Sequence, residues 1–396
     1  MPIDAAVIRQ TLDRTLAWSR EQDYREYTKH DALNSPLVWA IFGHHRLTRI
    51  LATQAVMRFP LNVRPLLGVT RSENPKGLAL FAMALFDSYE AFGEEHYRIE
   101  AEHLLERLLM LRSPGDWRGA CWGYQYAWQD LGFFAPKATP NAVVTAFVCE
   151  AFLRGYRVSG QPEYRRIVES ASKFFLNDLT VLKETAAEWC LAYMPLAMQM
   201  RVLDVSILIA AVLAQLQAIN GDERLAEHAR KLTRYVVNRQ TDEGAWFYTD
   251  PPDASPVKID NYHTGFILDA LDRVMTGLNS DEWRENHRRG AAFYAAHLFN
   301  AEGSPRWMSH QDYPHDIHGA AQGILTFSQP HHLQLHPGLA ARVIAWALTR
   351  MYDREGRFYY QQTRFYTKKF TFLRWCNAWM CRALAFYLLQ GRHEKS

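Results

Sequence analysis

The order of hydrophobic and polar residues predicts helices of two kinds. Amphipathic helices are expected near residues 96–111, 161–177, 223–239, 282–298 and 336–351. Other segments, such as 205–212, are apolar on all sides, which favours helices that are buried on every side. Almost no segment shows the alternation that is typical of a strand. The pattern therefore predicts an all-α fold.

The apolar helices follow polar starts that recur along the chain. The starts lie at Asn74, Asn141, Asp204, Asn261, Asp316 and Arg374. A repeat of this kind is typical of stacked helical hairpins. Apolar helices in an inner ring and amphipathic helices in an outer ring would form an (α/α)6 barrel, or toroid, over residues 1–396 as one domain. We expect the long helix near 35–57 to be the sixth outer helix and residues 1–34 to be an N-terminal helical extension.

Composition narrows the class of ligand. With 48% hydrophobic residues the chain can bury a large core, and a net charge of +3 gives no support for a nucleic-acid partner. The chain has 12 Trp, 19 Tyr and 21 Phe, and several of these lie beside Gly and Asp in short loops. Aromatic rings in polar clefts commonly stack on sugars, and the low net charge favours a sugar over a nucleic-acid base. We therefore expect a carbohydrate ligand.

Cysteine usage and the N-terminus predict a cytoplasmic protein. Five cysteines lie in apolar settings without a CxxC pair, which indicates buried free thiols. The first residues, 1–4, do not resemble a secretory signal. The longest apolar stretch, 205–219, is shorter than the roughly 20 residues of a transmembrane helix, so no such segment is expected. Neither a phosphate-binding loop nor a dependable histidine spacing occurs, with His331 and His332 weak candidates, and no cofactor or metal is predicted.

Two starts in the C-terminal half carry candidate catalytic groups. Around the fourth start, Asp260 or Asn261 can cap the helix, and Tyr262 or His263 could then face the mouth of the toroid. Around the fifth, Asp316 suits a helix cap. His318 is a second candidate there for proton transfer, because histidine titrates near neutrality. The alternative at both starts is a cap with packed or surface side chains.

Other residues are candidates for substrate binding. Arg364, Tyr366 and Lys368 alternate along a predicted extended loop, and Arg374 with Trp375 opens the last inner helix. Arginine binds carboxylates through a planar fork, so this region would suit an anionic sugar such as a uronate. Further candidates are Trp122, Tyr124 and Asn141, for which loop packing and helix initiation are the alternatives.

Several strings resemble a family of bacterial helical-toroid proteins from exopolysaccharide and surface-glycan biosynthesis. They are Trp122-Gly123-Tyr124, the segments 136–141, 259–266, 313–318 and 364–368, and the pairs Arg374-Trp375 and Ala378-Trp379. The toroid of this family is similar to the six-hairpin glycosidases. The segment 260–264 is distantly similar to the glucuronyl C5-epimerase C-terminal domain. The chain departs from the family at Ala127 and at Leu203, where polar groups are expected.

Together these features predict a carbohydrate-active protein that acts on a glycan or lipid-linked oligosaccharide, with biosynthetic proteins as further partners. The leading hypothesis is epimerase or lyase chemistry on a uronate, with Tyr262, His263 and His318 transferring protons. Glycoside hydrolysis by Asp260 and Asp316 is an alternative, which requires a defined separation of two carboxyl groups. A non-catalytic glycan-binding or scaffold protein is the other alternative.

Overall fold

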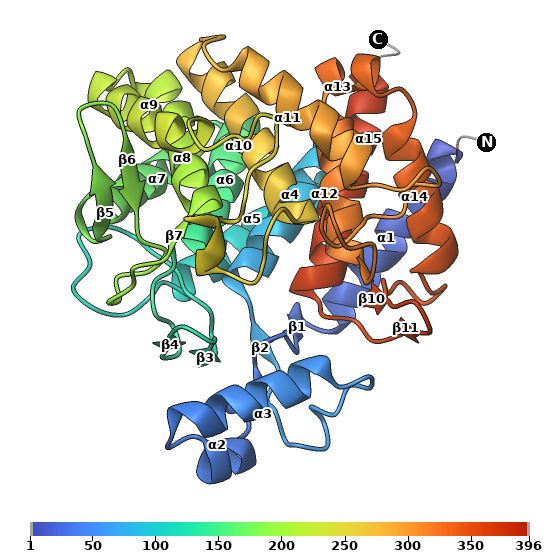
Figure 1. Cartoon of the computed structure of the whole chain (residues 1–396). Helices are drawn as coiled ribbons and strands as arrows, with labels where there is room; N and C mark the ends of the chain where they lie inside the picture. The colour runs from blue at the N-terminus through green and yellow to red at the C-terminus, as the bar shows by residue number, and fades with distance from the viewer. Residues whose placement is uncertain (1–2, 394–396) are drawn as a thin grey trace.

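Six inner helices surround a central axis, and each begins within five residues of a predicted polar start. The structure is a computed structural model that describes residues 3–393, and it confirms the predicted (α/α)6 toroid (Figure 1). The inner helices are α4 (Pro75–Phe92), α6 (Ala142–Ser159), α8 (Leu203–Asn220), α10 (Asn261–Leu278), α12 (Ile317–Phe327) and α15 (Trp379–His393). Before α15 the chain makes one π-helical turn over Arg374–Ala378. Asn74 and Asn141 cap α4 and α6 through their side chains.

The outer helices are amphipathic, as the sequence predicts. They are α1 (Ala5–Glu21), α5 (Glu95–Met110), α7 (Pro162–Asn177), α9 (Glu223–Val237), α11 (Arg284–His297) and α14 (Leu339–Arg350). The sixth outer helix is therefore α1, and the prediction that residues 35–57 would fill this place is wrong. Helix α1 packs on α15, and Tyr97 of α5 donates a hydrogen bond of 2.5 Å to Asp13 of α1.

A repeated glycine turn places α1 in the outer ring. After α11, Gly303 has a φ of +97°, and a Cβ there would lie 2.5 Å from the Arg342 carbonyl oxygen in α14. After α14, Gly356 has a φ of +100°, and a Cβ would lie 2.5 Å from the Arg14 carbonyl oxygen in α1. Only glycine combines this backbone conformation with such a close approach. The same turn thus joins α11 to α14 and α14 to α1, so α1 follows α14 in the outer ring.

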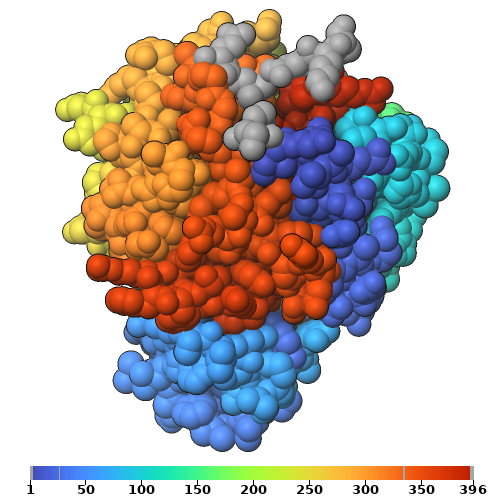
Figure 2. Space-filling view, turned by 90° about the vertical axis from the view of Figure 1, so that its right-hand side faces the viewer, coloured from blue at the N-terminus to red at the C-terminus, as the bar shows by residue number. Residues whose placement is uncertain are grey.

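The segment predicted as one long helix forms a separate hairpin. Residues 43–45 separate helix α2 (Pro36–Phe42) from helix α3 (Arg46–Arg58). The two helices project from the toroid next to its N-terminal mouth (Figures 1 and 2). Strands β1 (Arg25–Glu26) and β2 (Ser72–Glu73) pair at the base of this hairpin. The sequence pattern missed the interruption because the residues on both sides are helix formers.

Short strands and turns line the mouth from which the inner helices start. The antiparallel pairs are β3 (Trp128–Gln129) with β4 (Phe134–Ala135), β5 (Val181–Glu184) with β6 (Trp189–Leu191), and β7 (Arg201–Val202) with β8 (Thr249–Asp250). Strand β10 (Gln361–Gln362) lies between β9 (His315–Asp316) and β11 (Thr367–Lys368). The remaining short elements are the 3-10 turns η1 (Ala32–Asn34) and η2 (Pro252–Ala254) and the helix α13 (Pro330–Leu335).

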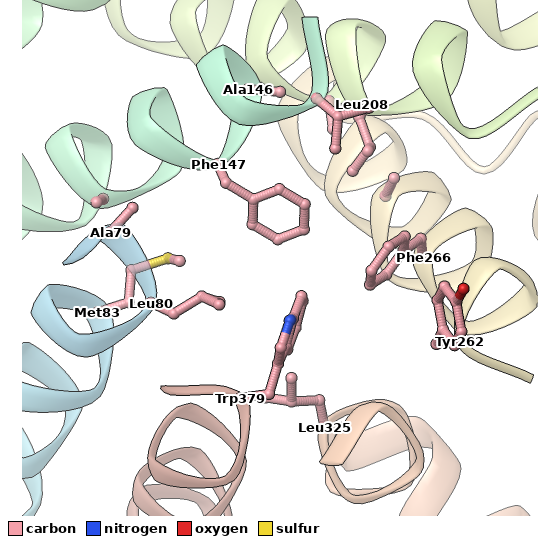
Figure 3. Close-up of a cluster of buried hydrophobic side chains, with 14 of the residues drawn as sticks. Ala79, Leu80, Met83, Ala146, Phe147, Leu208, Tyr262, Phe266, Leu325 and Trp379 are labelled. Atoms are coloured by element: carbon pink, nitrogen blue, oxygen red, sulfur yellow. The ribbon is translucent and has the colours of Figure 1, made fainter. Parts of the chain in front are cut away.

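Aromatic side chains fill the axis of the toroid. Figure 3 shows Phe147, Phe266 and Trp379 meeting from three inner helices, with ring centroids 5.3–5.6 Å apart. Leu80, Met83 and Leu325 pack around them. We call these six residues the axial plug. The plug prevents a continuous channel through the toroid and leaves a separate cavity at each end.

Burial explains the cysteines and the most apolar helix. All five cysteines are buried, as predicted. Among the described residues, α8 is the one helix whose length and composition would allow it to cross a membrane, and 72% of it is buried inside the fold. It contacts α6, α7, α9 and α10, which is the environment expected for an inner helix.

Candidate active site

A cavity of about 730 Å³ opens at the N-terminal ends of the inner helices. Phe266 of the axial plug lines it, and its walls come from the loops before the inner helices and from α3. Aromatic side chains are the largest group in the walls: Tyr124, Tyr126, Trp128, Phe133, Tyr193, Tyr248, Tyr262 and Trp375. The ionisable groups in the walls include Lys29, Lys76, Asp130, Asp204, His263 and Arg374. Such a cavity can hold the flat faces of sugar rings together with polar substituents.

His263 and Asp260 form a hydrogen-bonded dyad at the start of α10. His263 Nδ1 lies 2.9 Å from Asp260 Oδ2 and 3.0 Å from Oδ1. Asp260 is the N-cap residue, but its side chain makes no capping bond and binds the imidazole instead. A carboxylate that accepts the Nδ1 proton leaves the lone pair on Nε2. His263 lines the cavity, so this arrangement suits a general base.

Asp204 places a second carboxyl group opposite the dyad. It lies in the first turn of α8, and its Oδ2 is 3.9 Å from His263 Nε2. Its Oδ1 is buried without a hydrogen-bond partner. Burial raises the pKa of Asp204, and His263 and Lys76 oppose this shift. A raised pKa favours the protonated form, so Asp204 can serve as a general acid beside the base.

Lys76 is a buried amine at the base of the cavity. Its Nζ lies over the rings of Phe147 and Phe266, at 3.9 and 4.9 Å from their centroids. Burial, followed by repulsion from Arg374, holds the pKa of Lys76 well below its usual value. Charged or neutral, the amine faces the cavity as a hydrogen-bond donor. An anionic group bound nearby would favour its charged form.

Arg374 and Lys29 add two further cationic groups around Trp375. Arg374 is buried, its guanidinium lies 5.4 Å from the Tyr124 ring centroid, and its Nε has no hydrogen-bond partner. Lys29 Nζ lies 4.6 Å from the Trp375 ring centroid. Burial lowers the pKa of Lys29, and Asp316 partly offsets this effect. Three basic side chains against two carboxyl groups in the walls, together with converging helix N-termini, favour an anionic ligand.

His318 lies deeper, between two aromatic rings. Its imidazole stacks on Tyr262 at 4.5 Å and on Trp379 at 4.5 Å, with interplanar angles of 12° and 30°. Neither ring nitrogen has a hydrogen-bond partner. Burial, followed by repulsion from Lys76 and Arg374, holds the pKa of His318 well below its usual value. A neutral imidazole at this depth can accept or donate one hydrogen bond to a ligand.

Asp316 is engaged in structural hydrogen bonds beneath Trp375. Its carboxylate accepts bonds from Trp375 Nε1 at 2.8 Å, from Gln361 Nε2 at 2.7 Å and from the His318 backbone N–H at 2.9 Å. The predicted cap is therefore present. Neither Asp316 nor Asp260 is among the residues that line the cavity. Asp260 and Asp316, the pair considered for hydrolysis, therefore hold His263 and Trp375 in place and do not themselves line the cavity.

Several predicted binding residues lie outside the cavity. Trp122 is fully buried, and its Nε1 donates to the Leu108 carbonyl oxygen at 2.7 Å, so it packs in the core. Asn141 is a buried cap, and Asn261 bonds Leu298 and Tyr294. Arg364 and Tyr366 lie at the exposed turn between β10 and β11. The structure brings Tyr124, Tyr262, His263, His318, Arg374 and Trp375 together.

Two charged residues of the site were not singled out from the sequence. Lys76 and Asp204 each stand in the first turn of an otherwise apolar inner helix. A charge that interrupts such a run is the signal that could have found them, because burying it needs a compensating partner. The sequence pattern marks Asp204 only as the third polar start. The structure places its carboxyl group in the cavity, so the third start does contribute to the site.

Comparison with known proteins supports a class at the level of the fold. No protein-family model and no curated protein sequence matches this chain. Solved structures that match it include six-hairpin glycosidase-like enzymes, which confirms the predicted resemblance at the level of the fold. The surface-glycan context remains a prediction.

Three of these structures illustrate the likeness. Cellobiose 2-epimerase from Bacillus thermoamylovorans B4167 is 13% identical over 79% of this chain and 87% of its own, with a TM-score of 0.60. A polysaccharide lyase is 12% identical over 99% of this chain and 98% of its own, with a TM-score of 0.61. An unsaturated glucuronyl hydrolase specific for heparin is 13% identical over 83% and 89%, with a TM-score of 0.59. At these identities the likeness establishes a shared fold.

Proposed function

We propose that this protein is a carbohydrate-active enzyme that transfers a proton at a uronate residue of a glycan, as an epimerase or a lyase. The observation that carries the proposal is the arrangement of His263, Asp260 and Asp204. A base oriented by a carboxylate faces a carboxyl group whose pKa is raised, at 3.9 Å. Two titratable groups with different environments are the usual basis for separate acid and base roles.

The basic side chains of the cavity support an acidic sugar as the substrate. The proton beside a uronate carboxylate is weakly acidic, and its removal places further negative charge on the carboxylate. Arg374 and Lys76 can stabilise this charge in a site that excludes much of the water. The unpartnered Nε of Arg374 is a donor that a carboxylate oxygen can accept from.

The reaction has two outcomes that begin with the same step. His263 Nε2 removes the C5 proton. In a lyase, the C4–O bond then breaks, a C4–C5 double bond forms, and Asp204 gives its proton to the departing oxygen. In an epimerase, Asp204 instead gives its proton to C5 from the opposite face, and the proton taken up by His263 later passes to the Asp204 carboxylate. In the lyase, elimination leaves an imidazolium beside a carboxylate 3.9 Å away, so a proton can return between them.

The aromatic walls supply the binding surface for the sugar rings. Tyr124 and Tyr126 stack at 5.2 Å, and Trp375 is held in place by its hydrogen bond to Asp316. Rings fixed in this way present flat apolar faces without loss of side-chain freedom on binding. The resemblance to surface-glycan biosynthesis proteins supports a glycan or lipid-linked oligosaccharide precursor as the natural substrate.

One NMR experiment in D2O tests this proposal. The protein is incubated with uronate-containing disaccharides and, as a neutral comparison, with cellobiose. Loss of the C5 proton signal indicates proton transfer. New signals of an inverted sugar then indicate an epimerase, and a vinyl proton indicates a lyase. New anomeric signals with the C5 proton intact would indicate hydrolysis and contradict the proposal. Binding without any chemical change would support the non-catalytic alternative.

A further inference from the structure

A cluster of three histidines lies at the opposite end of the toroid from the candidate active site. His287 comes from α11, and His331 and His332 come from α13. One ligand atom from each residue can be chosen so that all three lie within 4.8 Å of one another. Their rings pack closely, with the His287 and His332 centroids 4.9 Å apart. The axial plug separates this cluster from the cavity that holds His263.

The unpartnered nitrogens of the cluster point to a ligand. His332 is buried, and neither of its ring nitrogens has a hydrogen-bond partner. The Nε2 of His331 has none either, and it lies 3.7 Å from Asp272 Oδ1 in α10. Burying polar atoms without partners is unfavourable, so such atoms call for an explanation. Three imidazoles and one carboxylate form a donor set that zinc commonly takes.

We propose that His287, His331 and His332 bind a Zn²⁺ ion, with Asp272 as the fourth ligand. Ligands at 2.0–2.1 Å from a tetrahedral zinc lie roughly 3.3 Å from one another. The histidine nitrogens would therefore close in by about 1.5 Å at most from their 4.8 Å limit. Helix α13 has six residues and is the element that can shift. The ion would join α10, α11 and α13, which is a structural role.

Metal content and thermal stability test the zinc site. The protein is freed of metal with a chelator, titrated with ZnCl2 and analysed by elemental mass spectrometry. We expect one zinc per chain and a higher Tm, because an ion that binds only the folded state stabilises it. His332→Gln and His287→Gln should each reduce affinity at least tenfold. The control is His103→Gln, an exposed histidine of α5.

The outcomes separate the zinc site from simple packing. If wild-type protein holds no stoichiometric zinc, or if His332→Gln binds zinc as the wild type does, the proposal is wrong. The rings would then be a stacked cluster of neutral imidazoles. Should His332→Gln fail to fold, His331→Gln provides the same test at a half-buried position.

A second and independent observation concerns the α2–α3 hairpin. Half of the exposed large hydrophobic side chains of the described residues lie between residues 37 and 66. In α3, Leu47 and Leu51 are 72% and 68% exposed, and their spacing of four places them on one face. Figures 1 and 2 show this hairpin as a projection from the toroid. An apolar surface of this kind marks an interaction site.

The charge of the hairpin distinguishes between its possible partners. Residues 32–72 contain five arginines and no acidic residue, and one of the five, Arg64, is buried and paired with Asp31. Arg46 and Arg58 are exposed close to the apolar face. A second copy of the same surface would bring like charges together. A bilayer with anionic lipids instead accepts the apolar side chains and attracts the arginines.

We propose that the α2–α3 hairpin docks on an anionic lipid surface. Gln54 and Met57 of α3 also line the candidate active site, so docking would hold the cavity mouth near the bilayer. This proposal stands whether or not the protein is an enzyme. If the substrate is lipid-linked, its sugar part would extend from the membrane into the cavity.

Vesicle flotation tests the docking proposal. We expect the protein to float with phosphatidylglycerol-containing vesicles and to remain behind with pure phosphatidylcholine or at high salt. Leu47→Ser with Leu51→Ser should weaken binding at least about tenfold. The control is Ile99→Ser with Met110→Ser, two exposed apolar residues of α5. No flotation, or a dimer in light scattering that only the hairpin variant dissociates, would contradict the proposal.

Discussion

Replacing His263 with Gln separates a catalytic role of this side chain from a structural one. The Gln amide can still donate to Asp260, which His263 contacts at 2.9 Å. The free energy of unfolding should therefore change by less than about 1.5 kcal/mol, the upper value for an ordinary hydrogen bond. The amide has no basic lone pair, so it is unable to remove a proton from the substrate. Activity should fall while the fold persists.

The size of the fall follows from the role assigned to the base. General acid–base catalysis contributes about 10²–10⁴ in rate. At 1.36 kcal/mol for each factor of ten, this corresponds to about 2.7–5.4 kcal/mol in the activation free energy. Exchange of the uronate C5 proton in D2O, followed by NMR, measures the rate directly. The control is His103→Gln, which should exchange like the wild type.

A rate close to that of the wild type would refute the reasoning. His263 would then be a packed residue beneath Tyr248, whose ring lies 4.3 Å away. If His263→Gln fails to fold, the exchange rate of Asp204→Asn tests the mechanism instead. That variant keeps the side-chain shape but removes the ionisable carboxyl group, and it should suppress elimination without abolishing C5 exchange.

Three further predictions concern the framework of the site. Asp316→Ala leaves buried donors on Trp375, Gln361 and His318 without an acceptor, so we expect a loss of about 3–5 kcal/mol in urea unfolding. The exposed Asp253→Ala is its control, and equal effects of the two variants would contradict this role. The lowered pKa of His318 keeps its imidazole neutral in the folded protein, whereas the unfolded chain gains a proton there below about pH 6.5. The free energy of unfolding should therefore decrease as the pH is lowered below this value. His318→Gln should flatten this slope by about 1.36 kcal/mol per pH unit, and an unchanged slope would count against it. Gly303 has a positive φ and lies against the backbone of Arg342, whereas Gly160 has a positive φ in open space. Gly160→Ala should destabilise the folded protein by about 1–2 kcal/mol, and Gly303→Ala should destabilise it clearly more.

The fold was predictable because the toroid repeats one unit. Asn74 and Asn141 cap their helices as their residue types indicate, and Gly303 closes a repeat at a positive φ. These are local effects of residue type, which sequence patterns capture. The place of α1 was not predictable, because it depends on which helix meets α15 and α14 in space. The pattern of residues 35–57 resembles that of an outer helix, although these residues project from the toroid.

The candidate site was predictable only in part. His263 and Arg374 stand at helix starts, and geometry brings every start to one mouth. The direction of a side chain is set by neighbours that are distant in sequence. Trp122 donates a hydrogen bond to Leu108 in the core, and Arg364 lies in an exposed turn. By residue type alone, Trp122 was as good a candidate as Tyr124, and Arg364 as good a candidate as Arg374.

The central claim is that the cavity binds an acidic sugar through its buried cationic groups, and calorimetric titration tests it most directly. A uronate-containing oligosaccharide is titrated into the wild type, into Arg374→Met and into Arg364→Met. Loss of a hydrogen bond to a charged group costs about 1.5–3 kcal/mol, so Arg374→Met should raise Kd roughly 10- to 150-fold. Arg364→Met, which removes an exposed charge outside the cavity, should bind like the wild type. Equal Kd values for all three proteins would contradict the account.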